Sequence, residues 1–302
     1  CVMEQYQDIW VRGKRESKGV RECESRYEMI ADIAGLFDRP FTVLDIGANL
    51  GYFSLRLAED FDCTVLALEG HYSSWLRDVL NKNGNDRVIA VSRTATLDDL
   101  RTLADVEHFD LTLALSVTHH VGASYSDVLK QVRRMGMATI LELPTERNAC
   151  GQASVQQTFI PDDGEVLGYG KSHLGGKERP LVLVEDDKTR LERSYWGTPL
   201  NDCDVEIRAD YHEKVKVQRG VESDWHRGIN LQTWLSMGPS WPSKSAVLGK
   251  VEAAKPTEQH GDLRPHNVVL QGDGAVFVDA MDPRRSVTSD ETGWNEIVGV
   301  LS

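Results

Sequence analysis

Hydrophobic positions along the first two thirds of the chain follow two alternating patterns. Short apolar runs typical of buried strands occur at residues 43–46, 64–68, 87–91, 111–115 and 139–143. Between these runs, apolar residues recur at the three- and four-residue spacing of an amphipathic helix, as in the segment 75–80. Strands that alternate with helices in this way predict a parallel, doubly wound α/β sheet, which binds ligands at the carboxyl ends of its strands.

Further elements are predicted on either side of these five strands. Apolar residues at helical spacing between Tyr27 and Leu36 predict helical cover before the first strand. The runs 165–169 and 181–185 predict two more strands, which we expect to form an antiparallel pair that closes the sheet. The sheet would then have seven strands, mostly parallel.

The character of the sequence changes beyond residue 204. A charged segment at 210–220 is followed by a new apolar segment at 229–235. We therefore predict one domain over residues 1–204 and a smaller α+β module over residues 205–302.

The first strand runs directly into a tight turn built on Gly47 and Gly51, and a helix follows at once. Glycine lets a ligand approach the bare backbone, and the free N–H groups of a helix N-terminus can bind a polar or anionic group. The second strand ends in Glu69, whose carboxylate can bind both hydroxyls of a ribose. This arrangement predicts a nucleotide-like cofactor. The alternative is an ordinary α/β turn followed by a surface glutamate.

The spacing of this loop differs from the dinucleotide-binding fingerprint. That fingerprint reads Gly-x-Gly-x-x-Gly, whereas the spacing here is Asp-x-Gly-x-x-x-Gly. This spacing, followed by a strand-end acid, resembles motif I and its successor in class I S-adenosylmethionine-dependent methyltransferases, whose parallel sheet is also closed by an antiparallel pair. The resemblance implies S-adenosylmethionine as the cofactor. It places five residues at the cofactor site: Asp45, Gly47, Asn49, Gly51 and Glu69.

Composition narrows the class of protein further. The 302 residues, 40% of them hydrophobic, are enough for one full α/β domain and a smaller module, and the formal charge of -13 argues against a nucleic-acid partner. The five cysteines are scattered without a Cys-x-x-Cys pair, which argues against a zinc cluster or a disulfide framework. No apolar run approaches the length of a membrane span and no signal-peptide pattern is found, so we expect a cytoplasmic location.

Further motifs narrow the resemblance to one family. They are found at residues 6–7, 21–26, 115–120, 140–143, 167–168, 173–174 and 179–180. In order and spacing they resemble the methyltransferase half of the bifunctional kinase/methyltransferases that terminate polymannose O-antigen chains in bacterial lipopolysaccharide synthesis. The resemblance implies that Tyr6, Gln7 and Arg26 cover the methionine end of the cofactor. It places around the rest of the cofactor Gly47, Glu69, Gly70, His71, Arg93, Thr94, Ala95 and Leu115.

The nature of the acceptor decides which groups the chemistry needs. The family methylates a terminal phosphate, which is already anionic and needs a cationic cradle, with His120 as a hydrogen-bond donor. The basic residues that could form this cradle are Arg12, Lys14, Lys18 and Arg21. A sugar or small-molecule hydroxyl would instead need His119 or His120 as a general base. A third interpretation gives the two histidines only packing and loop hydrogen bonds.

The segment 260–270 carries a second motif. Its sequence His-Gly-Asp-Leu-Arg-Pro-His-Asn resembles the catalytic loop of aminoglycoside-phosphotransferase-type kinases, and residues 275–279 resemble the strand and metal-binding aspartate that follow that loop. The resemblance implies Asp262 as the catalytic base, Asn267 and Asp279 as magnesium ligands, and ATP as the phosphoryl donor.

This module departs from the complete kinase pattern. No glycine-rich phosphate loop is found, the usual Asp-Phe-Gly reads Asp279-Ala280-Met281, and only Lys214 or Lys216 could serve as the strand lysine. The segment between residue 204 and the motif is also short for a kinase N-lobe. The module is therefore either a reduced or inactive kinase, or part of a kinase whose other segments are absent from this sequence.

Together these features predict an S-adenosylmethionine-dependent O-methyltransferase that methylates a phosphorylated glycan terminus, fused to a module that phosphorylates that terminus with ATP and Mg²⁺. A glycosyltransferase partner could hold such a protein at the inner membrane. Two alternatives stay open: a hydroxyl O-methyltransferase for a sugar or small molecule with an inactive kinase remnant, and a non-catalytic module that binds the cofactor. The sequence leaves the acceptor and the oligomeric state open.

Overall fold

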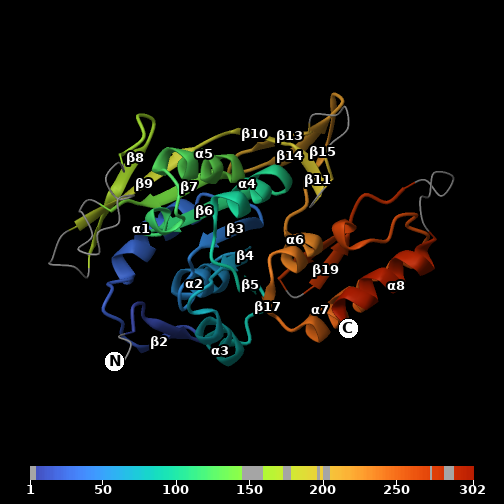
Figure 1. The fold of residues 1–302 in the computed structure, drawn as a ribbon, viewed down its shortest axis with the longest axis horizontal. Helices are drawn as coiled ribbons and strands as arrows, with labels where there is room; N and C mark the ends of the chain where they lie inside the picture. The colour runs from blue at the N-terminus through green and yellow to red at the C-terminus, as the bar shows by residue number, and fades with distance from the viewer. Residues whose placement is uncertain are drawn as a thin grey trace.

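The computed structural model describes residues 5–144, 159–172, 178–195, 198–199, 205–272, 274–281 and 289–302. Its central feature is an eight-stranded mixed sheet with the strand order β17-β5-β4-β3-β6-β7-β9-β8 (Figure 1). The family motif predicted at residues 173–174 lies outside the described residues, as do Cys1, Cys150 and Cys203.

The five predicted parallel strands are confirmed as the middle of this sheet. They are β3 (Phe41–Ile46), β4 (Cys63–Leu68), β5 (Val88–Val91), β6 (Phe109–Leu115) and β7 (Gly136–Glu142), each pairing in parallel with its neighbour. The predicted closing pair is also present. In it, β9 (Glu178–Glu185) runs antiparallel to both β7 and β8 (Glu165–Lys171).

The prediction of seven strands was short by one. The eighth strand, β17 (Pro239–Trp241), comes from the C-terminal third and pairs antiparallel with β5. A three-residue strand that begins with proline gives almost no local signal, because its strand character comes from the partner that it meets. The sheet of the first domain is therefore completed by the second module.

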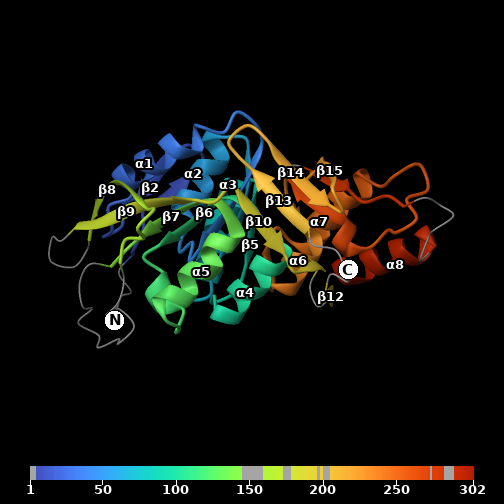
Figure 2. The ribbon, with the colours of Figure 1, turned by 90° about the horizontal axis from the view of Figure 1, so that it is seen from above.

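Five helices cover the two faces of the sheet. One face carries α1 (Glu24–Ala34), α2 (Tyr52–Asp60) and α3 (Ser73–Asn83), and the other carries α4 (Leu97–Val106) and α5 (Tyr125–Met135) (Figure 2). Successive residues of a strand point to opposite faces. In β3, accordingly, Val43 packs in the core under α1 to α3, whereas Leu44 and Ile46 pack in the core under α4 and α5.

The prediction of only helical cover before the first strand was wrong for residues 9–17. Two short strands, β1 (Ile9–Val11) and β2 (Lys14–Ser17), form a hairpin ahead of α1. Its turn has positive φ at Arg12 and Gly13, and Trp10 packs edge-on against Tyr52 at 5.8 Å between ring centroids. The hairpin is held by these tertiary contacts, which a local hydrophobic pattern does not encode.

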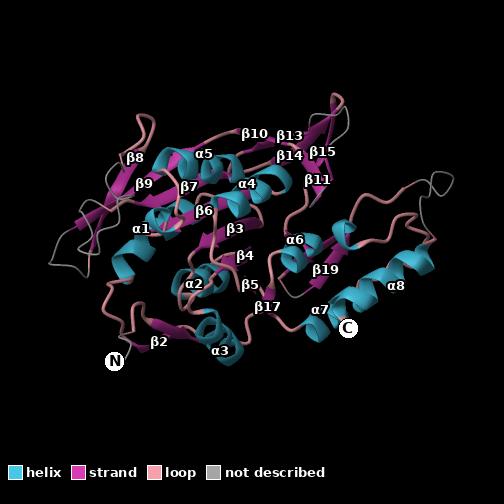
Figure 3. Cartoon of the chain, viewed as in Figure 1, coloured by secondary structure: helices cyan, strands magenta, loops and turns pink. Residues whose placement is uncertain are grey.

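Among its described residues, the second module contains two small sheets and three α-helices, which Figure 3 colours by secondary structure. One sheet has the order β10-β13-β14-β15, and the other has the order β16-β18-β19. The strands of these sheets are β10 (Lys188–Leu191), β13 (Val205–Ala209), β14 (Lys214–Gln218), β15 (Val221–Asp224), β16 (Ile229–Asn230), β18 (Val268–Gln271) and β19 (Gly274–Phe277). The helices are α6 (Leu231–Ser236), α7 (Lys244–Ala253) and α8 (Asp290–Leu301), and a further short pair joins β11 (Arg193–Tyr195) to β12 (Thr198–Pro199).

The division proposed at residue 204 cuts through the first of these sheets. Strand β10 lies before that residue, yet it pairs antiparallel with β13. The two modules also share one hydrophobic core, in which Leu44 and Leu103 belong to the same cluster as Trp234 and Ile297. No helix among the described residues has both the length and the apolar composition needed to cross a membrane.

Candidate functional site

A cavity of about 690 Å³ opens at the carboxyl ends of the parallel strands. Its size is within the range of about 300–1,000 Å³ typical of small-molecule sites. The walls come from the loops that follow β3, β4, β5 and β6, together with the N-terminal segment. The predicted site residues that line it are Tyr6, Gln7, Arg26, Gly47, Asn49, Glu69, Gly70, His71, Arg93, Thr94, Ala95, Leu115 and His120.

Glycine and asparagine shape the floor of this cavity. Gly47 has φ +74°, and a Cβ at Gly70 would come within 1.9 Å of Thr94 Oγ1 and 2.4 Å of the Thr94 backbone N, so both positions require glycine. Asn49 also has a positive φ, of 55°. Its Oδ1 is buried without a hydrogen-bond partner in the described part of the chain. A buried acceptor of this kind points to a donor supplied by a ligand.

Glu69 organises the loops around the cavity. Its Oε2 accepts a hydrogen bond from the backbone N–H of Asn49 at 2.8 Å, and its Oε1 accepts from the backbone N–H groups of His71 at 2.7 Å and Tyr72 at 2.9 Å. A carboxylate offers about four acceptor positions. The three backbone bonds leave one strong position, on Oε2, for a ligand hydroxyl.

Two of the predicted cofactor-binding residues do not line the cavity. Asp45 is buried beneath the loop, where it accepts a hydrogen bond from Ser54 Oγ at 2.6 Å. Burial raises the pKa of Asp45 to about 6. Gly51, with φ +76°, is the N-cap of α2, and a Cβ there would lie 2.7 Å from Leu76 Cδ1. Both residues therefore support the loop from behind, because the strand and the helix start turn them toward the core.

The N-terminal segment reaches the cavity through backbone pairing. The N–H of Arg21 donates to Tyr6 O at 2.9 Å, and the N–H of Val20 donates to Gln5 O at 3.0 Å. Gln7 Oε1 in turn accepts from the N–H of Leu50 in the glycine loop at 3.3 Å. These bonds place Tyr6 and Gln7 against the cavity, at the end where the family resemblance puts the methionine group.

The predicted cradle of Arg12, Lys14, Lys18 and Arg21 is not assembled at the cavity. Arg12 Nε donates to Lys82 O at the end of α3, at 3.1 Å, while Lys14 and Lys18 are exposed. Arg21 is fully buried and pairs with Glu142. Arg12 and Lys14 lie in the β1–β2 hairpin, which packs against α2 and α3, and neither residue lines the cavity.

The cation that sequence analysis missed is Arg179. It lines the cavity, and its Nη1 donates to Ser116 Oγ at 2.8 Å. Ser116 Oγ donates in turn to Glu142 Oε2 at 2.5 Å, and Arg26 Nη1 reaches the same oxygen at 3.2 Å. The only sequence signal for Arg179 is its place in the Arg-Pro pair of the family resemblance, which carried no role for it.

The two histidines lie in a short 3₁₀ helix (Thr118–His120) directly after β6, with ring centroids 4.0 Å apart. Burial, aided by the charges of His120 and Arg179, lowers the pKa of His119 to about 4. Burial and then Arg179 also lower the pKa of His120. Both rings are therefore neutral near pH 7, and His119 is a weak base.

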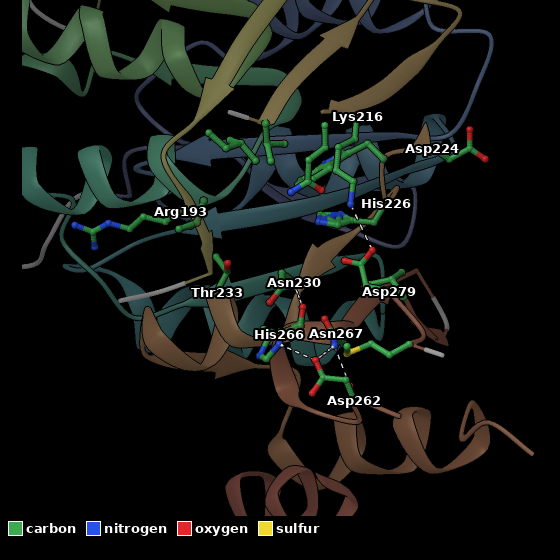
Figure 4. A pocket seen from close by; sticks show the side chains of 17 residues that line it. Arg193, Lys216, Asp224, His226, Asn230, Thr233, Asp262, His266, Asn267 and Asp279 are labelled. Atoms are coloured by element: carbon green, nitrogen blue, oxygen red, sulfur yellow. Dashed lines mark hydrogen bonds and ion pairs between the residues drawn. The ribbon is translucent and has the colours of Figure 1, made fainter. Parts of the chain in front are cut away.

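A second cavity, of about 350 Å³, is lined mostly by the C-terminal module, with Val106, Leu191 and Arg193 contributed from before residue 204 (Figure 4). It brings together the residues of the kinase-like motif. Asn267 Nδ2 donates to Asp262 Oδ2 at 3.0 Å, and Lys216 Nζ lies 3.4 Å from Asp279 Oδ1. The described residues hold no group of three or more His, Cys, Asp or Glu side chains arranged to bind a metal.

The structure distinguishes the two lysines that the sequence left open. Lys214 is buried away from the second cavity, where its Nζ donates to His108 O at 2.9 Å and lies 3.3 Å from Asp110 Oδ2. Lys216 lies two residues later on the same face of β14 and lines the second cavity, with its Nζ 3.4 Å from Asp279 Oδ1. Only Lys216 can therefore act there.

A pH-dependent prediction arises at the junction of the modules. Glu107 is buried there; it accepts a hydrogen bond from Thr233 Oγ1 at 2.7 Å, and burial raises its pKa from 4.5 to about 7. Since the folded pKa exceeds the unfolded one, the stability contributed by the bound proton is lost as pH rises between these values. Glu107→Gln, which keeps an acceptor oxygen, should raise the melting temperature at about pH 8 and change it little near pH 4.5. Circular dichroism melts across this range measure the difference, and an equal shift at both ends would contradict the assignment.

Comparison with known proteins agrees with this architecture. A family model described as a methyltransferase domain matches residues 44–136. The O-antigen chain terminator bifunctional methyltransferase/kinase WbdD of Escherichia coli is 24% identical over 205 residues, which are 62% of this chain and 28% of that protein. The chain thus spans little more than a quarter of the length of the curated relatives that it matches.

Solved structures of WbdD are similar in fold. The complex of WbdD with the kinase inhibitor LY294002 superposes with a TM-score of 0.52 at 18% identity, covering 92% of this chain and 80% of that one. A medium-resolution structure of WbdD also gives 0.52, at 17% identity, over 94% and 82% of the two chains. The sheet order, the cavity at the strand ends and the matching family model agree: this chain carries an S-adenosylmethionine-dependent methyltransferase domain in a class I methyltransferase-like α/β fold.

Proposed function

We propose that this protein is an O-methyltransferase that methylates a phosphate at a glycan terminus. The observation that carries the proposal is the polarity of the first cavity. Glu69 and the glycine loop form one end, suited to a nucleoside, and Arg26 and Arg179 form the other, suited to anions. WbdD is named as an O-antigen chain terminator, and by likeness the same kind of acceptor is proposed here.

The residues of the cavity fit S-adenosylmethionine. Glu69 Oε2 and Asn49 Oδ1, which has no partner among the described residues, offer acceptors for hydroxyl and amine groups, and Gly47 and Gly70 keep the floor free of side chains. When bound, the cofactor supplies an electrophilic methyl group: the O–CH3 bond forms as the S–CH3 bond breaks, the electron pair stays on sulfur, and a phosphate acceptor transfers no proton. The chain's own part is to align the acceptor oxygen and exclude water.

The state of the histidines favours an anionic acceptor. A hydroxyl acceptor requires a general base with a pKa near the working pH. Burial instead lowers the pKa of His119 to about 4, which makes it a poor base, and burial also lowers the pKa of His120, so both neutral rings can serve as hydrogen-bond partners. A phosphate oxygen needs only to be held, which the neighbouring arginines can do.

Methyl transfer to paired acceptors tests this proposal. The purified chain is incubated with S-adenosylmethionine and a mannose oligosaccharide that either carries or lacks a terminal phosphate, and the products are identified by mass spectrometry. Methylation of the phosphorylated form alone is expected. Methylation of the unphosphorylated form, lost in His120→Ala, would establish a hydroxyl O-methyltransferase, and cofactor binding without methylation of either would establish a non-catalytic module.

We further propose that the C-terminal module adds this phosphate from ATP, with Mg²⁺ held by Asn267 and Asp279 and with Asp262 as the catalytic base. The contacts in the second cavity support this, because Lys216 and Asp279 lie together as a phosphate-binding lysine and a metal-binding aspartate would. Phosphorylation would precede methylation at the same glycan end, which fits chain termination.

Asp279→Asn is expected to weaken Mg-ATP binding by at least about 10-fold, because the variant loses the charged ligand of the metal. Isothermal titration calorimetry measures this, with and without Mg²⁺. Asp224→Asn is the matched control, since this residue lines the same cavity away from the Asp262 loop (Figure 4). Absence of Mg-ATP binding by the wild-type chain would mean that the module is not a working kinase.

A further inference from the structure

We propose that Arg179 is the residue that binds the anionic acceptor and thereby selects phosphorylated over free glycan ends, with Ser116 and Glu142 fixing its position. This inference rests on the proposed methyltransferase function. It replaces the N-terminal cradle expected from the sequence by a residue at the start of β9.

Arg179 has the burial and the free donors of a ligand-binding arginine. Its residue is 2% exposed, yet it lines the first cavity. Within the described residues its guanidinium makes a single hydrogen bond, from Nη1 to Ser116 Oγ, and its buried Nε has no partner. A guanidinium carries five N–H donors in a fork that matches two phosphate oxygens. The remaining donors have no partner in the described part of the chain, and the cavity that Arg179 lines is where a ligand could accept from them.

The neighbours of Arg179 hold it in one orientation. Ser116 has φ +56°, an uncommon conformation for a residue other than glycine, directly after β6. This conformation lets its hydroxyl accept from Arg179 while donating to Glu142. Glu142, at the end of β7, is fully buried and also pairs with Arg21 and Arg26. The guanidinium is thus fixed by a continuous set of charge-assisted hydrogen bonds before any ligand arrives.

The charges in this cluster do not balance. Among the described residues, Arg21, Arg26 and Arg179 carry three positive charges, whereas Glu142 and the nearby Glu22 carry two negative ones, so cations outnumber carboxylates at this end of the cavity. Glu69 lies at the other end, with its carboxylate engaged by three backbone N–H groups. Uncompensated buried charge is costly, so anionic ligands are favoured here.

Three arginines line the cavity among the described residues: Arg93 pairs with Asp99 at 2.6 Å, and the other two, Arg26 and Arg179, each have their own neighbours. Arg26 pairs with Glu142, and its stem packs on Gly170, where a Cβ would lie 2.8 Å from its Cγ and Cδ. The family resemblance places Arg26 at the methionine carboxylate. Arg179 instead lies beside Ser116 and influences the titration of His119 and His120. The acceptor phosphate is therefore assigned to Arg179, with the neutral histidines as additional hydrogen-bond donors.

Separate titrations of cofactor and acceptor test this assignment. Calorimetry gives the Kd of S-adenosylhomocysteine, and then the Kd of a mannose disaccharide with a terminal phosphate on the chain saturated with S-adenosylhomocysteine. The variants are Arg179→Gln and Arg179→Lys, and the control is the double variant Lys14→Ala/Lys18→Ala, which neutralises exposed lysines outside the cavity. Circular dichroism melts check that each variant is folded.

Arg179→Gln is expected to weaken binding of the phosphorylated disaccharide by about 10- to 100-fold, and Arg179→Lys by less, since lysine keeps the charge but not the fork. In the Arg179 variants, the Kd of S-adenosylhomocysteine should change by less than about 3-fold. In the control variant, both Kd values should change by less than that. Loss of S-adenosylhomocysteine affinity with unchanged acceptor affinity would assign Arg179 to the cofactor instead. If the wild-type chain binds S-adenosylhomocysteine but binds the free disaccharide as tightly as the phosphorylated one, the proposed phosphate acceptor itself fails.

Discussion

Glu69→Ala is expected to lower the affinity for S-adenosylhomocysteine by at least about 100-fold. The carboxylate offers its open Oε2 position to the cofactor, and one hydrogen bond to a charged group is worth about 1.5–3 kcal/mol, or about 10- to 150-fold. The substitution also removes the acceptor for the backbone N–H groups of Asn49, His71 and Tyr72, so the loops on two sides of the cavity lose their common anchor. The two losses act on the same binding step.

Calorimetric titration with S-adenosylhomocysteine measures this effect, and melting temperatures separate it from unfolding. Glu258→Ala serves as the control, because that glutamate is exposed and lies far along the chain in the C-terminal module. The affinity of Glu69→Gln for S-adenosylhomocysteine should lie between those of Glu69→Ala and Glu258→Ala. Its amide oxygen can accept from the N–H groups of His71 and Tyr72, but its NH2 group presents a donor toward the N–H of Asn49. A folded Glu69→Ala variant with wild-type affinity would remove Glu69 from the cofactor site.

Trp234→Ala is expected to lower the free energy of unfolding of the whole chain by about 3–5 kcal/mol. Trp234 in α6 is completely buried, and its cluster includes Leu103 under the first sheet as well as Val268 in the second module. Its Nε1 also donates to Trp241 O in β17, at 3.3 Å. The cavity left by the indole would therefore lie in a core that belongs to both modules.

Chemical denaturation followed by circular dichroism measures the loss, while S-adenosylhomocysteine binding reports on the first module alone. Trp75→Ala is the matched control, since Trp75 on α3 is 42% exposed. This substitution should lower the free energy of unfolding by well under half as much as Trp234→Ala does. Both signals should shift together in Trp234→Ala. A variant that keeps its binding transition while the rest of the chain unfolds separately would show that the modules are independent.

Most residues that the sequence predicted for the cofactor line one cavity, because they follow the ends of neighbouring strands. In a parallel sheet, the residues that follow each buried strand meet at one edge, so Gly47, Glu69, Arg93 and Leu115 could be assigned to one cavity from local patterns and family motifs. The exceptions, Asp45 and Gly51, are close to the cavity in sequence but face the core. Local spacing gives position along the chain, whereas the direction of a side chain depends on how the loop packs.

The alternation of apolar runs and amphipathic segments was enough to predict the five parallel strands and their closing pair, because each buried strand has an apolar run in its own sequence. The tertiary structure alone decided the partners. In the tertiary structure, β17 pairs with the first sheet. Lys214 is buried in the core, whereas Lys216 lines the second cavity. Arg179 is linked to Glu142 through Ser116. These outcomes depend on contacts between segments far apart in sequence, and a local pattern of hydrophobic and polar residues carries no information about which distant group will be met.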